Sequence, residues 1–228
     1  MYRLYEYPPS GNSYKVLMAL RELGVPFEQV SVDILKGETR TPEFLAKNAN
    51  GRIPVLELDD GRTLAESGAI LMYLAATSHG EKGTELLPAD PWDRAKVLEW
   101  MFFEQYSHEP NIAVARFWQH SLHQTPEELG EKLEEKLKGG YAALDVMEAG
   151  LAGRDWLVAG RFTIADIALY AYTHVAHEGG FSLEAYPNIR AWIARIEARP
   201  GYQPMAEAWP CPSKDAGWSP HPPPSPRA

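Results

Sequence analysis

Ser10, Asn12 and Ser13 form a short cluster of hydroxyl and amide side chains directly after two prolines and directly before a helical pattern. The N-terminus of a helix presents free backbone N–H groups and a partial positive charge, which together stabilise a bound anion. A hydroxyl or amide donor beside a thiolate would lower the pKa of the thiol and raise its reactive fraction. The same side chains could instead cap the helix, so thiolate binding and capping both remain open.

A second candidate segment reads Asn-Gly-Arg-Ile-Pro over residues 50–54 and leads into a short apolar strand. Pro54 cannot donate a ladder hydrogen bond, and a proline at such a turn is a candidate for the cis form. The backbone of Ile53 is then free to pair with an extended, peptide-like ligand. A simple strand-initiating turn explains these residues equally well.

A third candidate segment is Glu66-Ser67, which lies at the start of another helical pattern. A carboxylate at Glu66 could pair with a ligand ammonium, and the Ser67 hydroxyl and N–H groups could bind a ligand carboxylate. Helix capping is again the alternative. Each of the three segments is a weak signal alone, but their order within one strand-and-helix frame is specific.

The second half of the chain offers a further group of polar residues on one helical pattern. Glu104 and His108 are four residues apart and share a helix face with Asn111. Arg116 follows on the same pattern and could meet an anionic group. We therefore consider Glu104, His108 and Arg116 as the lining of a second-substrate pocket, with a solvated or interface face as the alternative.

The elements that must position these residues alternate between strand and helix in the first 77 residues. The expected order is β-α-β-α-β-β-α, with elements over 2–7, 13–23, 27–32, 41–47, 55–58, 62–64 and 67–76. Gly24 should end the first helix, and Thr41-Pro42 should begin the second. This order predicts a small α/β domain over residues 1–77.

Helical patterns alone follow a glycine-rich linker over 78–88. We expect an all-helical domain over 89–210 and a proline-rich tail over 211–228. A long helix should run from Asp90 towards Trp118 with a bend at Pro110. Capping boxes at Thr125 and Thr163 should each begin a helix, and a last one should span 187–199. The Gly139-Gly140 pair should weaken the helix that contains it.

Composition excludes several classes of function. The formal charge is 22 − 31 = −9, so neither nucleic acid nor an anionic membrane is an expected partner. Cys211 is the single cysteine, which excludes a disulfide framework, a cysteine zinc site and a CxxC centre. No histidine pair has an evident third ligand, so no metal is expected. The N-terminus lacks the pattern of a signal peptide, which predicts a cytoplasmic protein.

The chain resembles the cytosolic glutathione transferase superfamily over nearly its whole length. The matching elements are Ser10-x-x-x-x-Lys15-Val16, Gly37-x-x-Arg40-x-Pro42-Glu43-Phe44, Asn50-Gly51-Arg52-Ile53-Pro54, Glu66-Ser67-x-Ala69-Ile70 and Thr163-x-x-Asp166. This resemblance implies a thioredoxin-like N-terminal domain, an all-α C-terminal domain and a homodimer. It implies a cis Pro54, Ile53 paired with the cysteinyl unit of glutathione, and Glu66 and Ser67 at its γ-glutamyl end. Arg40 stands where a basic residue meets the glycyl carboxylate, and Asp166 belongs to a folding element.

Within that superfamily the chain is most similar to serine- and asparagine-type enzymes, in particular the bacterial nu class. Ser10 and Asn12 stand where these enzymes place the donors to the glutathione sulfur, whereas Tyr5 and Tyr7 do not fall on the catalytic tyrosine position of other classes. The resemblance implies a transferase that moves glutathione, its co-substrate, onto a small electrophile. The alternatives are a glutathione-dependent disulfide reductase, run by two glutathione thiols, and a non-catalytic glutathione-binding scaffold.

Overall fold

The computed structural model of the chain describes residues 1–78 and 86–208. The expected tail over 211–228, with Cys211, lies outside the described residues, and so does most of the expected linker over 78–88. Within the described residues, no helix is long and apolar enough to cross a membrane.

The N-terminal domain has the expected order of strands and helices. Its elements are β1 (Tyr2–Glu6), α1 (Gly11–Leu23), β2 (Phe27–Ser31), η1 (Glu38–Arg40), α2 (Pro42–Leu45), β3 (Val55–Glu57), β4 (Thr63–Ala65) and α3 (Ser67–Thr77). The strand order is β2-β1-β3-β4. β1 is parallel to β2 and antiparallel to β3, with Leu4 opposite Leu56, and β4 is antiparallel to β3. The predicted order is confirmed.

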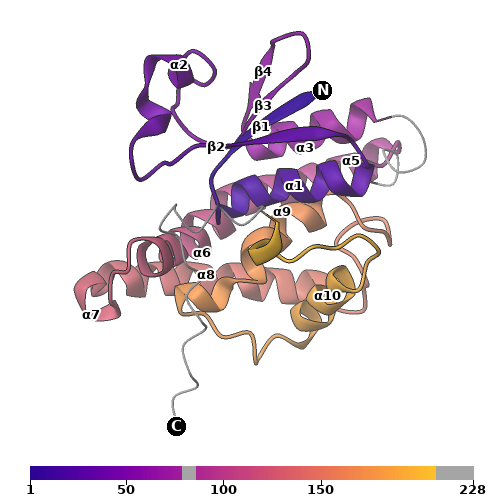
Figure 1. Cartoon of the computed structure of the whole chain (residues 1–228). Coiled ribbons are helices and arrows are strands. Elements are labelled where there is room, and N and C mark those ends of the chain that lie inside the picture. The colour runs from indigo at the N-terminus through magenta and orange to yellow at the C-terminus, as the bar shows by residue number, and fades with distance from the viewer. Residues whose placement is uncertain (79–85, 209–228) are drawn as a thin grey trace.

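Helix α1 carries the first candidate segment at its N-terminus and lies under the sheet. Ser10 is its N-cap, and Gly24, with a φ of 66°, ends it in the left-handed conformation that glycine adopts at low cost. Together with α3, α1 lies between the sheet and the helical domain (Figure 1). Any side chain on the first turn of α1 is therefore near the boundary between the two domains.

The second domain is all-helical in its described residues. Its elements are α5 (Pro91–Phe103), η2 (Glu104–His108), α6 (Glu109–Arg116), η3 (Phe117–Ser121), α7 (Pro126–Leu129), α8 (Glu131–Leu151), α9 (Ile164–Thr173), η4 (Ala176–Gly179), α10 (Pro187–Glu197) and η5 (Met205–Glu207). Segments η2 and η3 are π-helical turns. The long helix predicted from Asp90 is therefore interrupted by these turns and not simply bent at Pro110.

The capping box predicted at Thr125 is present and begins a helix, but this helix is shorter than expected, and the expectation for the Gly139-Gly140 pair is wrong. The capping box at Thr125 begins only the four-residue α7. This helix ends at Gly130, whose φ is 50°, and α8 begins at the next residue. The Gly139-Gly140 pair is not a weak point but a place of close packing. A Cβ at Gly139 would come within 2.6 Å of the Asn111 side chain, and one at Gly140 would overlap the Phe181 ring.

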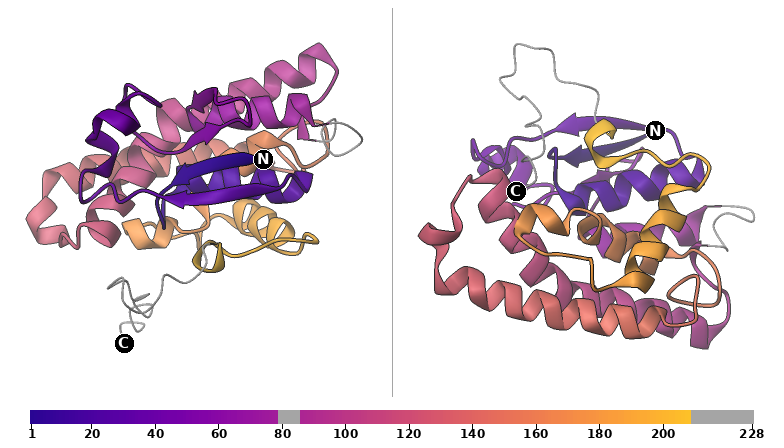
Figure 2. Two further views of the ribbon diagram at one scale, coloured as in Figure 1. Left: turned by 45° about the horizontal axis from the view of Figure 1, so that its top comes forward. Right: turned by 90° about the horizontal axis from the view of Figure 1, so that it is seen from below.

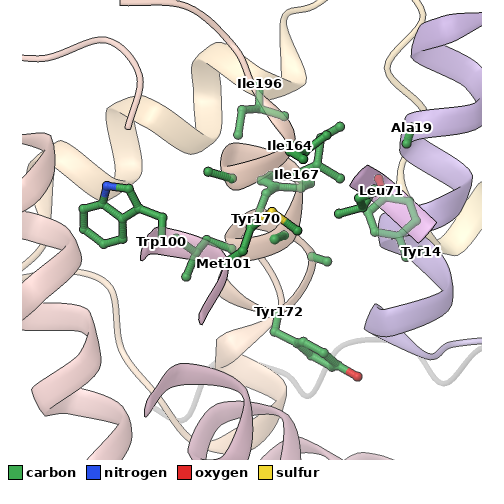
Figure 3. Packing of buried hydrophobic residues seen from close by; sticks show 14 of the residues in the cluster. Tyr14, Ala19, Leu71, Trp100, Met101, Ile164, Ile167, Tyr170, Tyr172 and Ile196 are labelled. Atoms are coloured by element: carbon green, nitrogen blue, oxygen red, sulfur yellow. The ribbon is translucent and has the colours of Figure 1, made fainter. Parts of the chain in front are cut away.

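Helix α9 is the centre of the core, since all ten of its residues are buried. Ile164, Ile167 and Tyr170 point into the main cluster of hydrophobic side chains (Figure 3). The capping box predicted at Thr163 is present. Asp166 accepts hydrogen bonds from the backbone of Leu157 and Thr163 and from Trp192 Nε1 at 2.9 Å. This buried carboxylate therefore fixes the start of α9, and it lies outside the site described below.

The two domains are joined further by the C-terminal described segment, which returns to α1 (Figure 2). The Tyr14 hydroxyl donates to the Gln203 carbonyl at 2.6 Å, and Arg21 donates to the Ala208 carbonyl at 2.7 Å. Arg199 forms an ion pair with Glu22 at 2.6 Å. These contacts hold α1 against the helical domain, and with it the first candidate segment.

Candidate active site

The first turn of α1 opens onto a cavity of about 470 Å³ at the boundary between the domains. Ser10 and Asn12 line it from the N-terminal domain, together with Arg40, Arg52 and Ile53. The helical domain contributes both apolar and polar side chains. The residues on that side are Glu109, Ala113, Val114, Arg116, Phe117, Ser121 and Tyr172. A cavity of this size with convergent polar groups is typical of a small-molecule site.

A smaller cavity of about 70 Å³ adjoins the first one and holds the other predicted residues. Pro54, Glu66 and Ser67 line it, and Asn12 and Ile53 line both cavities. The Ile53–Pro54 peptide bond is cis, as the resemblance implied. Of the ten predicted site residues, the structure thus brings eight to these two cavities.

Glu66 holds an unusual backbone conformation at the edge of the smaller cavity. Its φ of 67° is in the left-handed region that non-glycine residues rarely adopt. Such strain concentrates at functional sites because only a well-determined environment maintains it. The Glu66 carbonyl accepts from Ile70, and the conformation places Glu66 at the N-terminus of α3 beside Ser67.

Asn12 is a residue of both cavities whose side chain has several hydrogen-bond partners. Its Oδ1 accepts from Lys15 Nζ at 2.8 Å and from Ser67 Oγ at 3.5 Å. Its Nδ2 donates to Glu109 Oε1 at 3.3 Å, and its backbone N–H donates to the Tyr172 hydroxyl at 3.3 Å. Partners from α1, α3 and α6 therefore fix the side-chain amide in one orientation, and α9 holds the backbone of the same residue.

Ser10 is a helix cap in the structure and a cavity residue at the same time. Its Oγ accepts from the Ser13 N–H at 3.3 Å, which is the capping alternative raised from the sequence. The same hydroxyl has its own hydrogen to donate. Capping the helix and donating to a ligand in the larger cavity are therefore compatible roles.

Arg40 and Arg52 supply positive charge to the larger cavity. Arg40 donates to the Asn50 carbonyl at 3.1 Å, and its guanidinium packs on Gly51. A Cβ at Gly51 would come within 2.6 Å of Arg40 Nη1, and the φ of 60° there also favours glycine. Gly51 thus leaves room for Arg40. Arg52 lines both cavities. It belongs to the Asn50–Pro54 motif, but the sequence did not predict it as a site residue.

Two of the residues expected in a second-substrate pocket do not line either cavity. Glu104 is 1% exposed and forms an ion pair with Lys15 at 2.8 Å, and His108 is fully buried with Nε2 at 2.9 Å from Thr173 Oγ1. The expectation for these two is wrong, because Glu104 is paired across the packed boundary between the domains and His108 is packed against α9 inside the helical domain. Arg116 does line the larger cavity.

The guanidinium of Arg116 is held by protein groups. It pairs with Glu178 at 2.5 Å and donates to the Pro9 carbonyl at 2.9 Å. It is 4% exposed. Its contact with Pro9 fixes the loop that leads to Ser10, so Arg116 supports the shape of the cavity.

Glu109 and Tyr172 line the site but were missed from the sequence. Tyr172 lies in the fully buried α9, so its sequence pattern indicates a core residue. Its hydroxyl nevertheless points away from the apolar cluster (Figure 3). Burial is the main cause that raises the pKa of Tyr172, and also the main cause that raises the pKa of Glu109. No simple periodicity marks Glu109, because the π-helical turn before it shifts the helical register.

Comparison with known proteins agrees with this arrangement. Residues 1–76 match the glutathione S-transferase N-terminal domain, and residues 105–200 match the glutathione S-transferase C-terminal domain. Glutathione S-transferase 3 of Zea mays is 36% identical over 92% of this chain and 95% of its own length. The chain belongs to the glutathione S-transferase family. The predicted fold class is thereby confirmed.

Solved structures of this family extend the comparison. A glutathione S-transferase from Pseudomonas fluorescens superposes with a TM-score of 0.84 at 53% identity, over 90% of this chain and 98% of that one. Ure2p in complex with glutathione superposes with a TM-score of 0.81 at 28% identity, over 91% and 97%. The transcriptional regulator URE2 of Saccharomyces cerevisiae is 28% identical over 87% of this chain, which spans 66% of that regulator. The family resemblance therefore includes both named transferases and a named regulator.

No group of three or more histidine, cysteine or acidic side chains that could hold a metal occurs in residues 1–78 and 86–208 of this transferase-family protein. The side-chain groups that line the two cavities include hydroxyls, the Asn12 amide, arginines and the carboxylates of Glu66 and Glu109.

Acid should destabilise this protein through His108. Burial, with a smaller effect of Lys15, lowers the pKa of His108 to about 3, and burial lowers the pKa of His174 to about 4. At these two histidines the unfolded chain binds more protons than the folded one below a pH of about 6.5, so the stability that they contribute above that pH is lost as the pH falls. Each histidine contributes a slope of up to about 1.4 kcal/mol per pH unit.

The free energy of unfolding measured in urea between neutral and acid pH checks this expectation. His108→Gln should make the pH dependence shallower, since glutamine carries no proton to bind. His177→Gln, at an exposed position, should leave the wild-type dependence unchanged. An identical slope in wild type and His108→Gln would contradict the prediction.

Proposed function

We propose that this protein binds glutathione, stabilises its thiolate with Ser10 and Asn12, and transfers the glutathione, bonded through its sulfur, to an electrophilic small molecule. The observation that carries the proposal is the position of Asn12, whose amide lies where the two cavities meet. A tripeptide bound across that point would place its central thiol beside the first turn of α1. The partial positive charge of that helix end and the two donors would then favour the anionic sulfur.

The ends of the tripeptide fit the remaining groups. The smaller cavity offers the Glu66 carboxylate for an ammonium and the Ser67 hydroxyl and N-terminus of α3 for a carboxylate, which are the two groups of a γ-glutamyl end. The backbone of Ile53 is available to the cysteinyl unit, and Arg40 and Arg52 provide charge for the glycyl carboxylate. The named complex of Ure2p with glutathione supports this choice of ligand.

The second substrate enters the larger cavity. Its wall on the helical side includes the apolar side chains of Ala113, Val114 and Phe117, so we propose an apolar electrophile. A solved structure of Ure2p in complex with S-p-nitrobenzylglutathione supports this choice, because a related protein binds an aromatic conjugate. A disulfide is the alternative acceptor; reduction would then run on glutathione thiols, since Cys211 is the only cysteine of the chain.

The scaffold alternative is favoured by one observation, the similarity to the regulator URE2. A scaffold could keep the peptide-binding groups without activating the thiol. We propose the enzyme because Ser10 and Asn12 are both present and both line the cavity. The same two residues lead us to propose a serine- and asparagine-type protein similar to the nu class. We separately propose that it acts in the cytoplasm, as expected from its sequence.

We also propose that the protein acts as a homodimer. Phe102 and Tyr106 are four residues apart on the helical run of α5 and η2 and are 69% and 88% exposed. Large aromatic side chains that stay this exposed on one segment mark an interaction surface. A second copy of the chain is the partner that the family resemblance implies, and sedimentation of the purified protein measures it.

Titration of the bound thiol tests the proposed function. Ultraviolet absorbance of the thiolate should give bound glutathione a pKa at least about one unit below that of the free tripeptide, which corresponds to about 1.4 kcal/mol of preferential binding of the anion. S-methylglutathione, which has no thiol, is the control for absorbance changes of the protein. Saturable binding of glutathione with an unshifted thiol pKa would leave the scaffold as the better interpretation.

A further inference from the structure

The π-helical turn η2 brings two glutamates to one side of the helical domain. The Glu109 N–H donates to the Glu104 carbonyl, a hydrogen bond between residues five apart. In a regular α-helix, residues five apart point about 140° away from each other, whereas a π turn places them closer to one above the other. Both carboxylates consequently face α1, where Glu104 meets Lys15 and Glu109 meets Asn12. Such turns occur frequently at functional sites.

The two carboxylates have different surroundings. Glu104 is paired with Lys15, also accepts from Gln105 at 2.8 Å, and lines neither cavity. Glu109 lines both cavities, and its hydrogen-bond partner is the neutral Asn12 amide. Two acidic groups whose environments differ in this way usually have different roles, one as a fixed charge and one as a proton acceptor.

We propose that Glu109 accepts the thiol proton of bound glutathione, an inference that rests on the proposed function. The S–H bond breaks and its electron pair stays on sulfur, which becomes the thiolate. The proton bonds to a Glu109 carboxylate oxygen, so the total charge of the site does not change. Glu109 is then neutral and competes less for Asn12 Nδ2, which leaves this donor for the sulfur.

The charges around Glu109 are compatible with this transfer. Lys15 and Asn12 face it from α1, Arg52 from the loop before β3, Glu104 from η2 and Tyr172 from α9. Burial raises the pKa of the Glu109 carboxyl and Glu104 raises it further, while Lys15, Arg52 and the Asn12 hydrogen bond lower it. A thiolate on the other side of the Asn12 amide adds a second negative charge. Two neighbouring anions retain one proton between them more readily than either would alone.

Proton counting during glutathione binding tests the role of Glu109. The thiolate is followed by its ultraviolet absorbance, and protons released to a weakly buffered solution near neutral pH are followed with an indicator dye. The wild type should form thiolate with much less than one proton released per thiolate. Glu109→Gln should release about one proton per thiolate, because glutamine cannot accept it. Subtracting the signal of S-methylglutathione removes protons that come from the rest of the tripeptide.

The controls separate this inference from the proposed function. Glu99→Gln, an exposed carboxylate on α5, should behave as the wild type. Equal proton release per thiolate in wild type and Glu109→Gln would overturn the role of Glu109 and leave thiolate activation intact. Weaker glutathione binding by Glu109→Gln with an unchanged proton count would overturn it as well, and would assign Glu109 to the ligand ammonium. Saturable binding without any thiolate in the wild type would overturn both proposals.

Discussion

Replacement of Lys15 by methionine should lower the free energy of unfolding by about 3–5 kcal/mol. Lys15 is 1% exposed and pairs with Glu104 across the boundary between the domains. Removing the ammonium leaves the Glu104 carboxylate buried without its counter-charge, a penalty much larger than the net strength of the pair. Urea unfolding followed by circular dichroism measures the loss.

A double variant shows whether the penalty comes from the unpaired charge. Lys15→Met/Glu104→Leu removes both charges and should recover much of the stability lost in Lys15→Met, since a well-packed apolar pair is often as stable as a buried ion pair. Lys96→Met, in the more exposed Lys96–Glu99 pair, should cost less than about 1 kcal/mol. Equal losses in Lys15→Met and Lys96→Met would contradict the assignment.

The same double variant separates stability from thiol activation. Lys15 also donates to Asn12 Oδ1 at 2.8 Å. The double variant regains stability but still lacks Lys15, one of the groups that orient the Asn12 amide. Its bound glutathione should therefore keep a thiol pKa higher than in the wild type. The ion pair thus couples the docking of the two domains to the first turn of α1.

Most of the N-terminal site could be predicted because its residues act locally. Ser10 follows a proline pair and starts a helix, Ile53-Pro54 precedes a strand, and Glu66-Ser67 starts another helix. Short-range rules of capping, proline geometry and strand alternation fix such positions. The capping box at Thr163 was predictable for the same reason, and the structure places it at the centre of the core.

The helical side of the site could not be predicted in the same way. A regular period of 3.6 residues puts Glu104 and His108 on one face, but the π-helical turn changes which residues face α1. Local sequence does not show that Lys15 and Glu104 form an ion pair across the domain boundary. This pairing is what makes the burial of both residues possible. The same π-helical turn also sets the direction of the Glu109 side chain, so its place in the site depends on how the two domains pack together.

Replacement of Asn12 by alanine should have the largest effect on activity. Removal of one preorganised donor to a developing or bound anion typically reduces kcat by a factor of about 100–1000. Asn12 in addition holds Lys15, Ser67 and Glu109 in their positions. We therefore expect kcat/KM with glutathione and chlorodinitrobenzene to fall at least about 100-fold and the pKa of the bound thiol to rise by about one unit or more.

Ser10→Ala is the matched comparison, because Ser10 lines the same cavity and also caps α1. Loss of the cap should cost about 1 kcal/mol of stability, a loss that is separate from that of the side-chain hydrogen bonds removed by Asn12→Ala. Asn12→Asp keeps the shape of the side chain but replaces the amide donor by an anion, so it should impair thiolate formation at least as strongly as alanine does. If Asn12→Asp retained full activity, the amide would not be the donor to sulfur, and Asn12 would serve only to hold Lys15 in place.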